Sequence, residues 1–189
     1  MKKLYSLVAA VVLMSGCSYQ NEAIELSAYK PQYLGKTPQD QNTISFISVT
    51  DGRDDKTSIG YVEANGVVTS KFYSYVDFAS RYKEAIASAM QAGKFNVAKN
   101  AAQANEIIGV NIKTIQIVYN DTNKFDENLR GKIVVEVTRT KGDKTLIQTI
   151  TQQEGKWIKP SYTSKDIEPV LDSLFTDSIN SIAAKLAEK

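Results

Sequence analysis

The residue types that most often carry out catalysis are nearly missing from this chain. Among its 189 residues there is no histidine and a single cysteine, Cys17. Histidine is the usual general base at neutral pH, and Ser/His or Cys/His pairs activate most nucleophiles. Both residue types are also the main protein ligands of zinc. No phosphate-binding glycine loop or nucleophile elbow replaces them. We therefore expect no enzyme, no metal site and no cofactor.

An acidic cluster is the remaining candidate for cation chemistry. It consists of Asp51, Asp54 and Asp55, with Arg53 between them. Carboxylates bind hard cations such as Ca²⁺, but the ligand spacing of an EF-hand is absent. Aspartate side chains also accept hydrogen bonds from the backbone two residues on and so stabilise turns. The cluster is interpreted as a solvated turn, and a cation site is the alternative.

The first 16 residues have the pattern of a signal peptide. Lys2 and Lys3 precede an apolar run over residues 4–13, and small residues follow. A basic start, a short apolar region and small residues before a cleavage point are typical of secretion signals. The run of about ten residues is too short to cross a bilayer, which takes roughly 20. Residues 1–16 are therefore predicted to be removed.

Cys17 directly follows this signal. The sequence Ser15-Gly16-Cys17 resembles a bacterial lipobox, with Met14 where leucine is most common. The resemblance implies cleavage before Cys17 and acylation of Cys17, palmitate included. Each buried methylene contributes about 0.8 kcal/mol, so two or more acyl chains anchor a protein durably. The alternative is an ordinary cleaved signal with an incidental cysteine.

The net charge of the mature chain and its expected membrane both depend on this cleavage. The whole chain has 23 Lys+Arg against 21 Asp+Glu, and loss of Lys2 and Lys3 leaves a neutral mature chain. A neutral chain gives no support for a nucleic-acid partner. Ser18 stands where enterobacterial sorting uses aspartate to retain lipoproteins in the inner membrane. By resemblance to that rule, we expect the outer membrane, with the domain facing the periplasm or the cell surface.

Three aromatic residues are candidates for binding a partner: Tyr73, Tyr75 and Trp157. Tyrosine and tryptophan are enriched in interface cores and at binding hot spots. Phe72 and Phe78 belong to the same aromatic segment and are expected in the core. The alternative is structural, with the two tyrosines at the sheet edge and Trp157 sealing one end of the core.

Two regions follow the signal. Residues 17–42 are polar, contain Pro31 and Pro38, and have no sustained periodicity. They are interpreted as the lipidated cysteine and a flexible tether; the alternative places residues 24–33 along the domain as an edge segment. Residues 43–189 are long enough for a single domain with its own core.

Strand signals are frequent within this domain. The β-branched run at residues 44–49 predicts a first strand. Asn65-Gly66 between two apolar runs predicts a hairpin with a type I′ turn. The apolar face of residues 107–119 changes partway, which predicts a β-bulge near Lys113-Thr114. Residues 133–137 and 145–151 predict a second, antiparallel hairpin.

Two helices are expected. Ser74 and Asp77 resemble a capping box that starts the first, and Gly93 is expected to end it in a left-handed conformation. Thr163 and Asp166 resemble a second capping box, with Pro169 in the first turn. Apolar residues recur at helical spacing after each start. The sequence predicts an α+β fold: a two-layer sandwich with a mostly antiparallel sheet packed by two main helices.

The order of these elements resembles the YajG-like family of small outer-membrane lipoproteins. The resemblance supplies no catalytic residues that could be assigned to positions of this chain. It is carried by the lipobox, residues 49–53 closing the first strand, the hairpin at 65–66, the helix ending near 93–97, and residues 101–104 before the strand at 107.

We therefore expect a non-catalytic, lipid-anchored module that binds a protein in the envelope or on a host surface. Cell adhesion and envelope maintenance are the two roles considered. The alternative is a periplasmic carrier of a small ligand or lipid, which requires an apolar pocket between sheet and helices.

Overall fold

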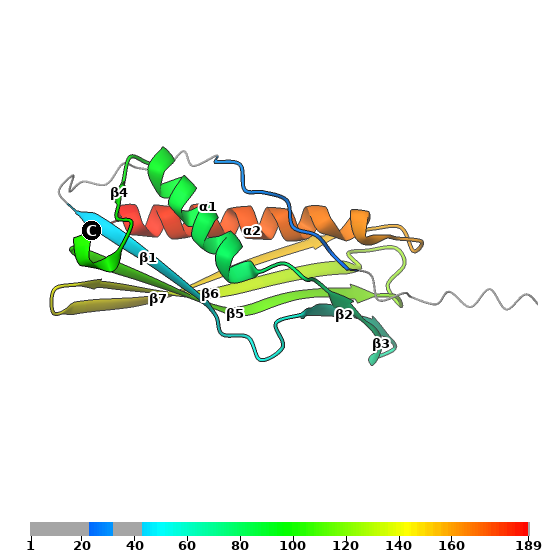
Figure 1. The fold of residues 1–189 in the computed structure, drawn as a ribbon. Coiled ribbons are helices and arrows are strands. Elements are labelled where there is room, and N and C mark those ends of the chain that lie inside the picture. The colour runs from blue at the N-terminus through cyan, green and yellow to red at the C-terminus, as the bar shows by residue number, and fades with distance from the viewer. Residues whose placement is uncertain (1–22, 32–42, 189) are drawn as a thin grey trace, which may run out of the picture.

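A mixed sheet of seven strands carries two helices on one of its faces (Figure 1). The computed structural model describes residues 23–31 and 43–188. The strands are β1 (Ile44–Asp51), β2 (Ser58–Ala64), β3 (Val67–Tyr73), β4 (Asn96–Val97), β5 (Glu106–Asn120), β6 (Leu129–Lys141) and β7 (Lys144–Lys156). The helices are α1 (Phe78–Ala92), the 3-10 turn η1 (Ala101–Gln103) and α2 (Ser164–Ala187).

The longest strand, β5, lies in the centre of the sheet. On one side it pairs with β6 along most of its length, and β6 pairs with β7; we call β6 and β7 the hairpin flank. On its other side two strands share one edge: β1 pairs with Glu106–Ile112 and β2 with Ile117–Asn120. β4 and β3 extend the sheet beyond β1 and β2. We call β1 to β4 the split flank.

The prediction of a mostly antiparallel sheet is wrong. The pairs β1–β5, β2–β5 and β1–β4 are parallel, whereas β2–β3, β5–β6 and β6–β7 are antiparallel. Parallel neighbours need a crossover connection. Helix α1 supplies it: it packs on β1 and returns the chain to the end where β1 begins, so that β5 enters parallel to β1. The two-layer arrangement and the two main helices are confirmed.

The local strand signals are confirmed. Asn65 and Gly66 both have positive φ angles, 52° and 78°, as a type I′ turn requires. The register of β5 against β6 shifts between Ile112 and Thr114, which is the predicted β-bulge. β6 and β7 form the second hairpin, which turns at Gly142 and Asp143.

The first helix differs from the prediction at both ends. Asp77, not Ser74, is the N-cap of α1, and its carboxylate accepts a hydrogen bond from the Ser80 N–H at 3.1 Å. Gly93 has a φ of −77°, and Lys94 takes the left-handed conformation at 62°. The N–H groups of Lys94 and Phe95 donate to the carbonyls of Gln91 and Met90. These two bonds form a Schellman motif with Lys94 in the position where glycine is usual.

The capping box of α2 is confirmed, since the Thr163 N–H donates to the Asp166 carboxylate at 2.8 Å. Pro169 lies inside the helix, in its second turn rather than its first. The predicted apolar stripe is fully buried against the sheet and α1: Ile167, Leu171, Leu174, Phe175, Ile179, Ile182 and Leu186.

Large side chains fill the space between the sheet and the helices. Tyr82 and Phe175 pack edge to face with ring centroids 4.8 Å apart. The buried Tyr82 hydroxyl forms a 2.8 Å hydrogen bond with Ser178, which joins α1 to α2. Burial raises the pKa of the Tyr82 phenol far above its usual value. Every buried side-chain nitrogen or oxygen of the described residues has a hydrogen-bond partner.

Residues 23–31, which we call the docked segment, lie against the domain (Figure 1). The Ile24 N–H donates to the Tyr73 carbonyl at 2.7 Å, and the Ile24 side chain is fully buried. The Ser27 N–H donates to Asp172 and the Tyr29 hydroxyl to Asn180, both on α2. These contacts agree with the alternative, in which an edge segment lies along the domain. The rest of residues 17–42 lies outside the described residues.

Candidate interaction surfaces

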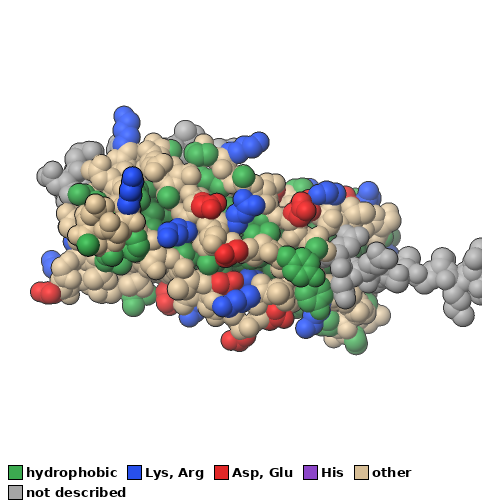
Figure 2. Space-filling model, viewed as in Figure 1, with side chains coloured by type: hydrophobic (Ala, Val, Ile, Leu, Met, Phe, Trp, Pro, Cys, Tyr) green, Lys and Arg blue, Asp and Glu red, His purple; other side chains and the backbone are tan. Residues whose placement is uncertain are grey.

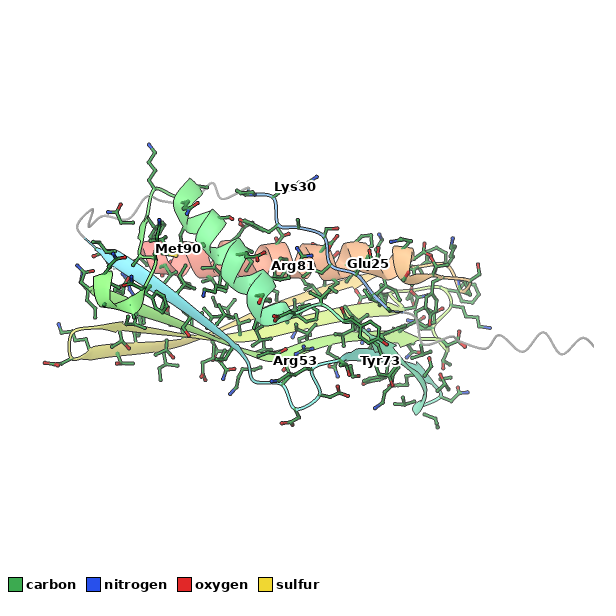
Figure 3. All side chains as sticks on the ribbon, in the orientation of Figure 1. Glu25, Lys30, Arg53, Tyr73, Arg81 and Met90 are labelled. Carbon is green, nitrogen blue, oxygen red and sulfur yellow. The ribbon has the colours of Figure 1, made fainter. Side chains whose placement is uncertain are left out.

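The acidic cluster is organised around a buried ion pair. Arg53 donates from Nε and Nη2 to the two Asp51 oxygens, at 2.9 and 2.7 Å, and from Nη2 to the Lys56 carbonyl. Its guanidinium lies 4.9 Å from the centroid of the Phe78 ring, at the start of α1. Figure 3 shows Arg53 where the chain passes from β1 to β2. The pair therefore holds this connection against the core.

The other two carboxylates of the cluster lie on the exposed side of the same connection. Asp55 accepts hydrogen bonds from the N–H groups of Ser58 and Thr57, each at 3.0 Å, and from the Thr57 hydroxyl. These bonds, that from Ser58 first, lower the pKa of the Asp55 carboxyl. Asp54 is exposed. Among the described residues, no group of three or more acidic, histidine or cysteine side chains could hold a metal ion.

The two candidate tyrosines differ in exposure. Tyr73 ends β3, is half-buried, and contributes its backbone carbonyl to the docked segment. Tyr75 follows the strand and is 84% exposed. Only Tyr75 therefore presents most of its side chain to a partner. Cys17, the predicted lipidation site, lies outside the described residues.

Trp157 lies at the end of the sheet where β5 and β7 finish. Its side chain is 49% exposed, and its Nε1 donates to the Lys124 carbonyl at 3.0 Å. Lys124 belongs to the loop of residues 121–128, in which the next residue, Phe125, is 93% exposed. Trp157 is therefore bonded to the residue that precedes an exposed phenylalanine. The sequence interpretation did not select Phe125, although it is the only aromatic residue of this polar loop.

The same loop contacts the β2–β3 turn. The Asp121 N–H donates to the Glu63 carbonyl at 2.8 Å, and the Asn65 N–H donates to the Thr122 hydroxyl at 2.9 Å. The exposed Val67 and Val68 directly follow that turn. The loop thus brings three segments to one end of the molecule. We call the exposed apolar side chains there the loop-end surface: Val67, Val68, Phe125 and Trp157.

A second group of exposed apolar side chains lies at the opposite end of the sheet, which we call the far-end surface: Ile44, Ile107, Leu146 and Ile147. β1 and β5 begin at this end and the β6–β7 hairpin turns there. Beside these side chains, the buried Glu106 carboxylate accepts hydrogen bonds from Ser45 and Arg139. Arg139 also donates to the Glu188 carbonyl just beyond α2.

Charge is distributed evenly over the face seen in Figure 2. Acidic and basic side chains alternate across it, with hydrophobic side chains between them and no large region of one sign. This face therefore offers no broad electrostatic attraction to a strongly charged partner.

A comparison with known protein families shows which family this chain belongs to. A family described as "Uncharacterized lipoprotein" matches residues 33–185. The chain belongs to this lipoprotein family. Membership confirms the resemblance to YajG-like lipoproteins and indicates a membrane-anchored protein of the cell envelope. No curated protein matches the chain. Neither helix of the described residues is long and apolar enough to cross a membrane.

Several solved structures are similar to this lipoprotein at low sequence identity. A Xanthomonas campestris protein of family DUF330 is 11% identical, with a TM-score of 0.52 over 87% of this chain and 89% of that one. A minor lipoprotein from Acinetobacter baumannii is 12% identical, with a TM-score of 0.42 over 68% and 91% of the two chains. Lipoprotein GNA1162 from Neisseria meningitidis is 11% identical, with a TM-score of 0.36 over 75% and 98%. At these identities the likeness to the first structure concerns the fold alone.

Proposed function

We propose that this lipoprotein is a non-catalytic module, anchored in the outer membrane by acyl chains on Cys17, that binds a partner protein. The observation that carries the proposal is the grouping of its exposed large apolar side chains. They lie at the two ends of the sheet and at Tyr75, whereas the core between sheet and helices is filled. Grouped apolar surface of this kind is typical of interaction sites.

The filled core also argues for a binding module over a carrier. A carrier needs an apolar cavity large enough for its ligand. Here Tyr82, Phe78 and Phe175 occupy the layer between α1, α2 and the sheet, each with almost no accessible surface. A ligand could enter this layer only by displacing these side chains, which would then lose their van der Waals contacts in the close-packed interior.

Lipid anchoring is tested by substitution of the predicted acylation site. We expect the wild-type chain to incorporate radiolabelled palmitate and to remain with membranes after a high-salt wash. Cys17→Ala should lose the label and leave the membrane fraction. Retention of Cys17→Ala on washed membranes, with no label in the wild type, would contradict the proposal.

Partner binding is tested by photo-crosslinking in intact cells. A photoreactive side chain would be placed at Tyr75 or at Ile147, both exposed. Glu84 on the solvent side of α1 is the matched control position. We expect a discrete crosslinked protein from position 75 or 147 and none from position 84. Equal crosslinking from all three positions would show only random encounters with other proteins and would contradict the proposal.

Adhesion and envelope maintenance differ in the side of the membrane that the domain occupies. Adhesion to a host surface requires an outward-facing domain, and envelope maintenance requires a domain in the periplasm. Labelling of surface lysines on intact cells with a membrane-impermeant reagent separates the two. If labelling needs permeabilised cells, the adhesion role is excluded.

A further inference from the structure

The docked segment limits how far the domain can stand from its lipid anchor. Six steps along the chain separate Cys17 from Ala23, which is bridged to Tyr73 of β3. Fully extended, six residues span about 20 Å. A free tether up to residue 42 would have allowed any orientation, but this short connection keeps one part of the domain close to the membrane.

The geometry of the sheet decides which end that is. Gly60 pairs with both Phe72, next to Tyr73, and Ile117 of β5, so these residues lie at one level of the sheet. Ile107, on the far-end surface, is ten residues from Ile117 along β5, about 30 Å away. The chain from Cys17 to Ala23 is too short to cover that distance.

The loop end is within reach of the same connection. Ala23, the first described residue of the docked segment, pairs with Tyr73 in the parallel direction, so the segment runs in the same direction as β3, with the β2–β3 turn on its N-terminal side. Six residues back along β3 from Tyr73 is Val67, which belongs to the loop-end surface. In Figure 1 the β2–β3 turn lies at the right-hand end of the sheet, away from the C-terminus.

We propose that the loop-end surface is a membrane-contact site, with Trp157 and Phe125 inserted into the lipid interface beside the acyl anchor. The inference rests on the proposed anchoring through Cys17. It assigns these side chains to lipid and leaves the far-end surface and Tyr75 for a protein partner.

The chemistry of the surface fits the interface of a bilayer. Aromatic rings are enriched where headgroups meet acyl chains. The Trp157 N–H is already bonded to the Lys124 carbonyl, so its ring can leave water without an unsatisfied donor. Residues 121–128 carry one lysine against Asp121, Asp126 and Glu127, and the exposed Lys156 and Lys159 flank Trp157, so the charges around the surface balance. Binding should therefore depend on burial of apolar side chains and not on anionic lipids.

Trp157 is the only tryptophan of the chain and reports directly on this contact. The full lipidated protein would be reconstituted in phosphatidylcholine vesicles with brominated acyl chains, which quench nearby tryptophan. We expect the Trp157 emission to be quenched relative to unbrominated vesicles. We also expect it to be shifted to the blue relative to the Cys17→Ala chain in buffer without vesicles. Replacement of part of the phosphatidylcholine by phosphatidylglycerol should leave the quenching unchanged.

The matched control moves the reporter to the far end. This control is the double variant Trp157→Phe with Ile147→Trp. Both positions are exposed, so the variant should fold, and circular dichroism checks that it does. We expect no quenching from position 147. Quenching at both positions, or at neither while the protein floats with the vesicles, would overturn the assignment and leave the anchoring intact. Failure of the wild-type protein to float with vesicles would overturn the anchoring and, with it, this assignment.

Discussion

The two flanks of β5 are built in different ways. On the hairpin flank, β6 and β7 have 13 residues each and pair in register along their whole length. On the split flank, β1 and β2 have eight and seven residues and lie end to end along the same edge of β5. Their connection is held by the buried Asp51–Arg53 pair.

This difference concerns how each flank is stabilised. Antiparallel strands joined by a two-residue turn pair residues that are close in sequence. Many equivalent backbone hydrogen bonds then stabilise the pair, so the loss of one has a small effect. The split flank depends on pairings far apart in sequence and on a few buried contacts. Single substitutions should therefore affect the split flank more strongly, and the following predictions test that comparison in order of expected effect.

Gly60→Ala on the split flank should have the largest effect. An added Cβ would overlap the backbone carbonyl of Ile117 on β5, which cannot move without breaking the parallel pairing. We expect a loss of about 3 kcal/mol or more in the free energy of unfolding, measured by urea titration. Gly109→Ala is the control, since its Cβ would meet Thr138 only at ordinary contact distance. Equal stability of the two variants would contradict the comparison.

Asp51→Ala should have the second-largest effect on the free energy of unfolding. It leaves the Arg53 guanidinium, only 5% exposed, without its carboxylate. Removal of one partner of a buried pair typically costs about 3 kcal/mol. The control is Glu127→Ala, in the loop before β6, which breaks the exposed pair with Arg130 on the hairpin flank and should cost less than about 1 kcal/mol. If both variants unfold at the same urea concentration, the buried pair does not stabilise the split flank.

Gly131→Ala on the hairpin flank should cost about 1–2 kcal/mol. Its Cβ would overlap a terminal methyl of Leu174 on α2, a flexible side-chain end that can rotate away. Thermal unfolding followed by circular dichroism should place this variant between wild type and Gly60→Ala. A loss as large as that of Gly60→Ala would show that the two flanks are equally intolerant.

Tyr82→Phe tests the contact that joins the helices above the two flanks. It removes the hydrogen bond to Ser178 and should cost about 1 kcal/mol at neutral pH. Burial raises the pKa of the folded phenol above its unfolded value of 10.0. The unfolded chain therefore loses this proton first, so wild-type stability is kept below pH 10 and falls as pH rises further. The phenylalanine variant should show a smaller decline at high pH.

Lys94→Gly should have the smallest effect and the opposite sign. Lys94 ends α1 with a positive φ, which costs an L-residue more than glycine. After the larger backbone entropy of glycine in the unfolded chain is counted, we expect a gain of up to about 1 kcal/mol. Urea titration measures it, and Lys94→Ala, which keeps the strain, should show no gain.

The candidate surfaces were predictable only in part. Trp157 and Tyr75 were selected by residue type, and both are substantially exposed. Val67, Val68 and Phe125 were missed, because their grouping depends on hydrogen bonds of the 121–128 loop to Asn65 and Trp157. Nothing in the spacing of these residues indicates that the three segments meet.

The sequence by itself determined the elements whose signals are local. The Asn65-Gly66 turn, the bulge after Ile112 and the apolar stripe of α2 each depend on neighbouring residues, and periodicity along one element is enough to find them. The lipoprotein signal predicted at Cys17 also depends on a short, contiguous pattern.

Only the tertiary structure decided the parallel pairing of β1 and β2 with β5 and the docking of residues 23–31. Ser27 and Tyr29 bond to Asp172 and Asn180, more than 140 residues away. The docked segment has no period of its own, and Ile24 is buried because β3 and α2 provide a surface for it. Such contacts form when distant segments are brought together, and no local pattern records them.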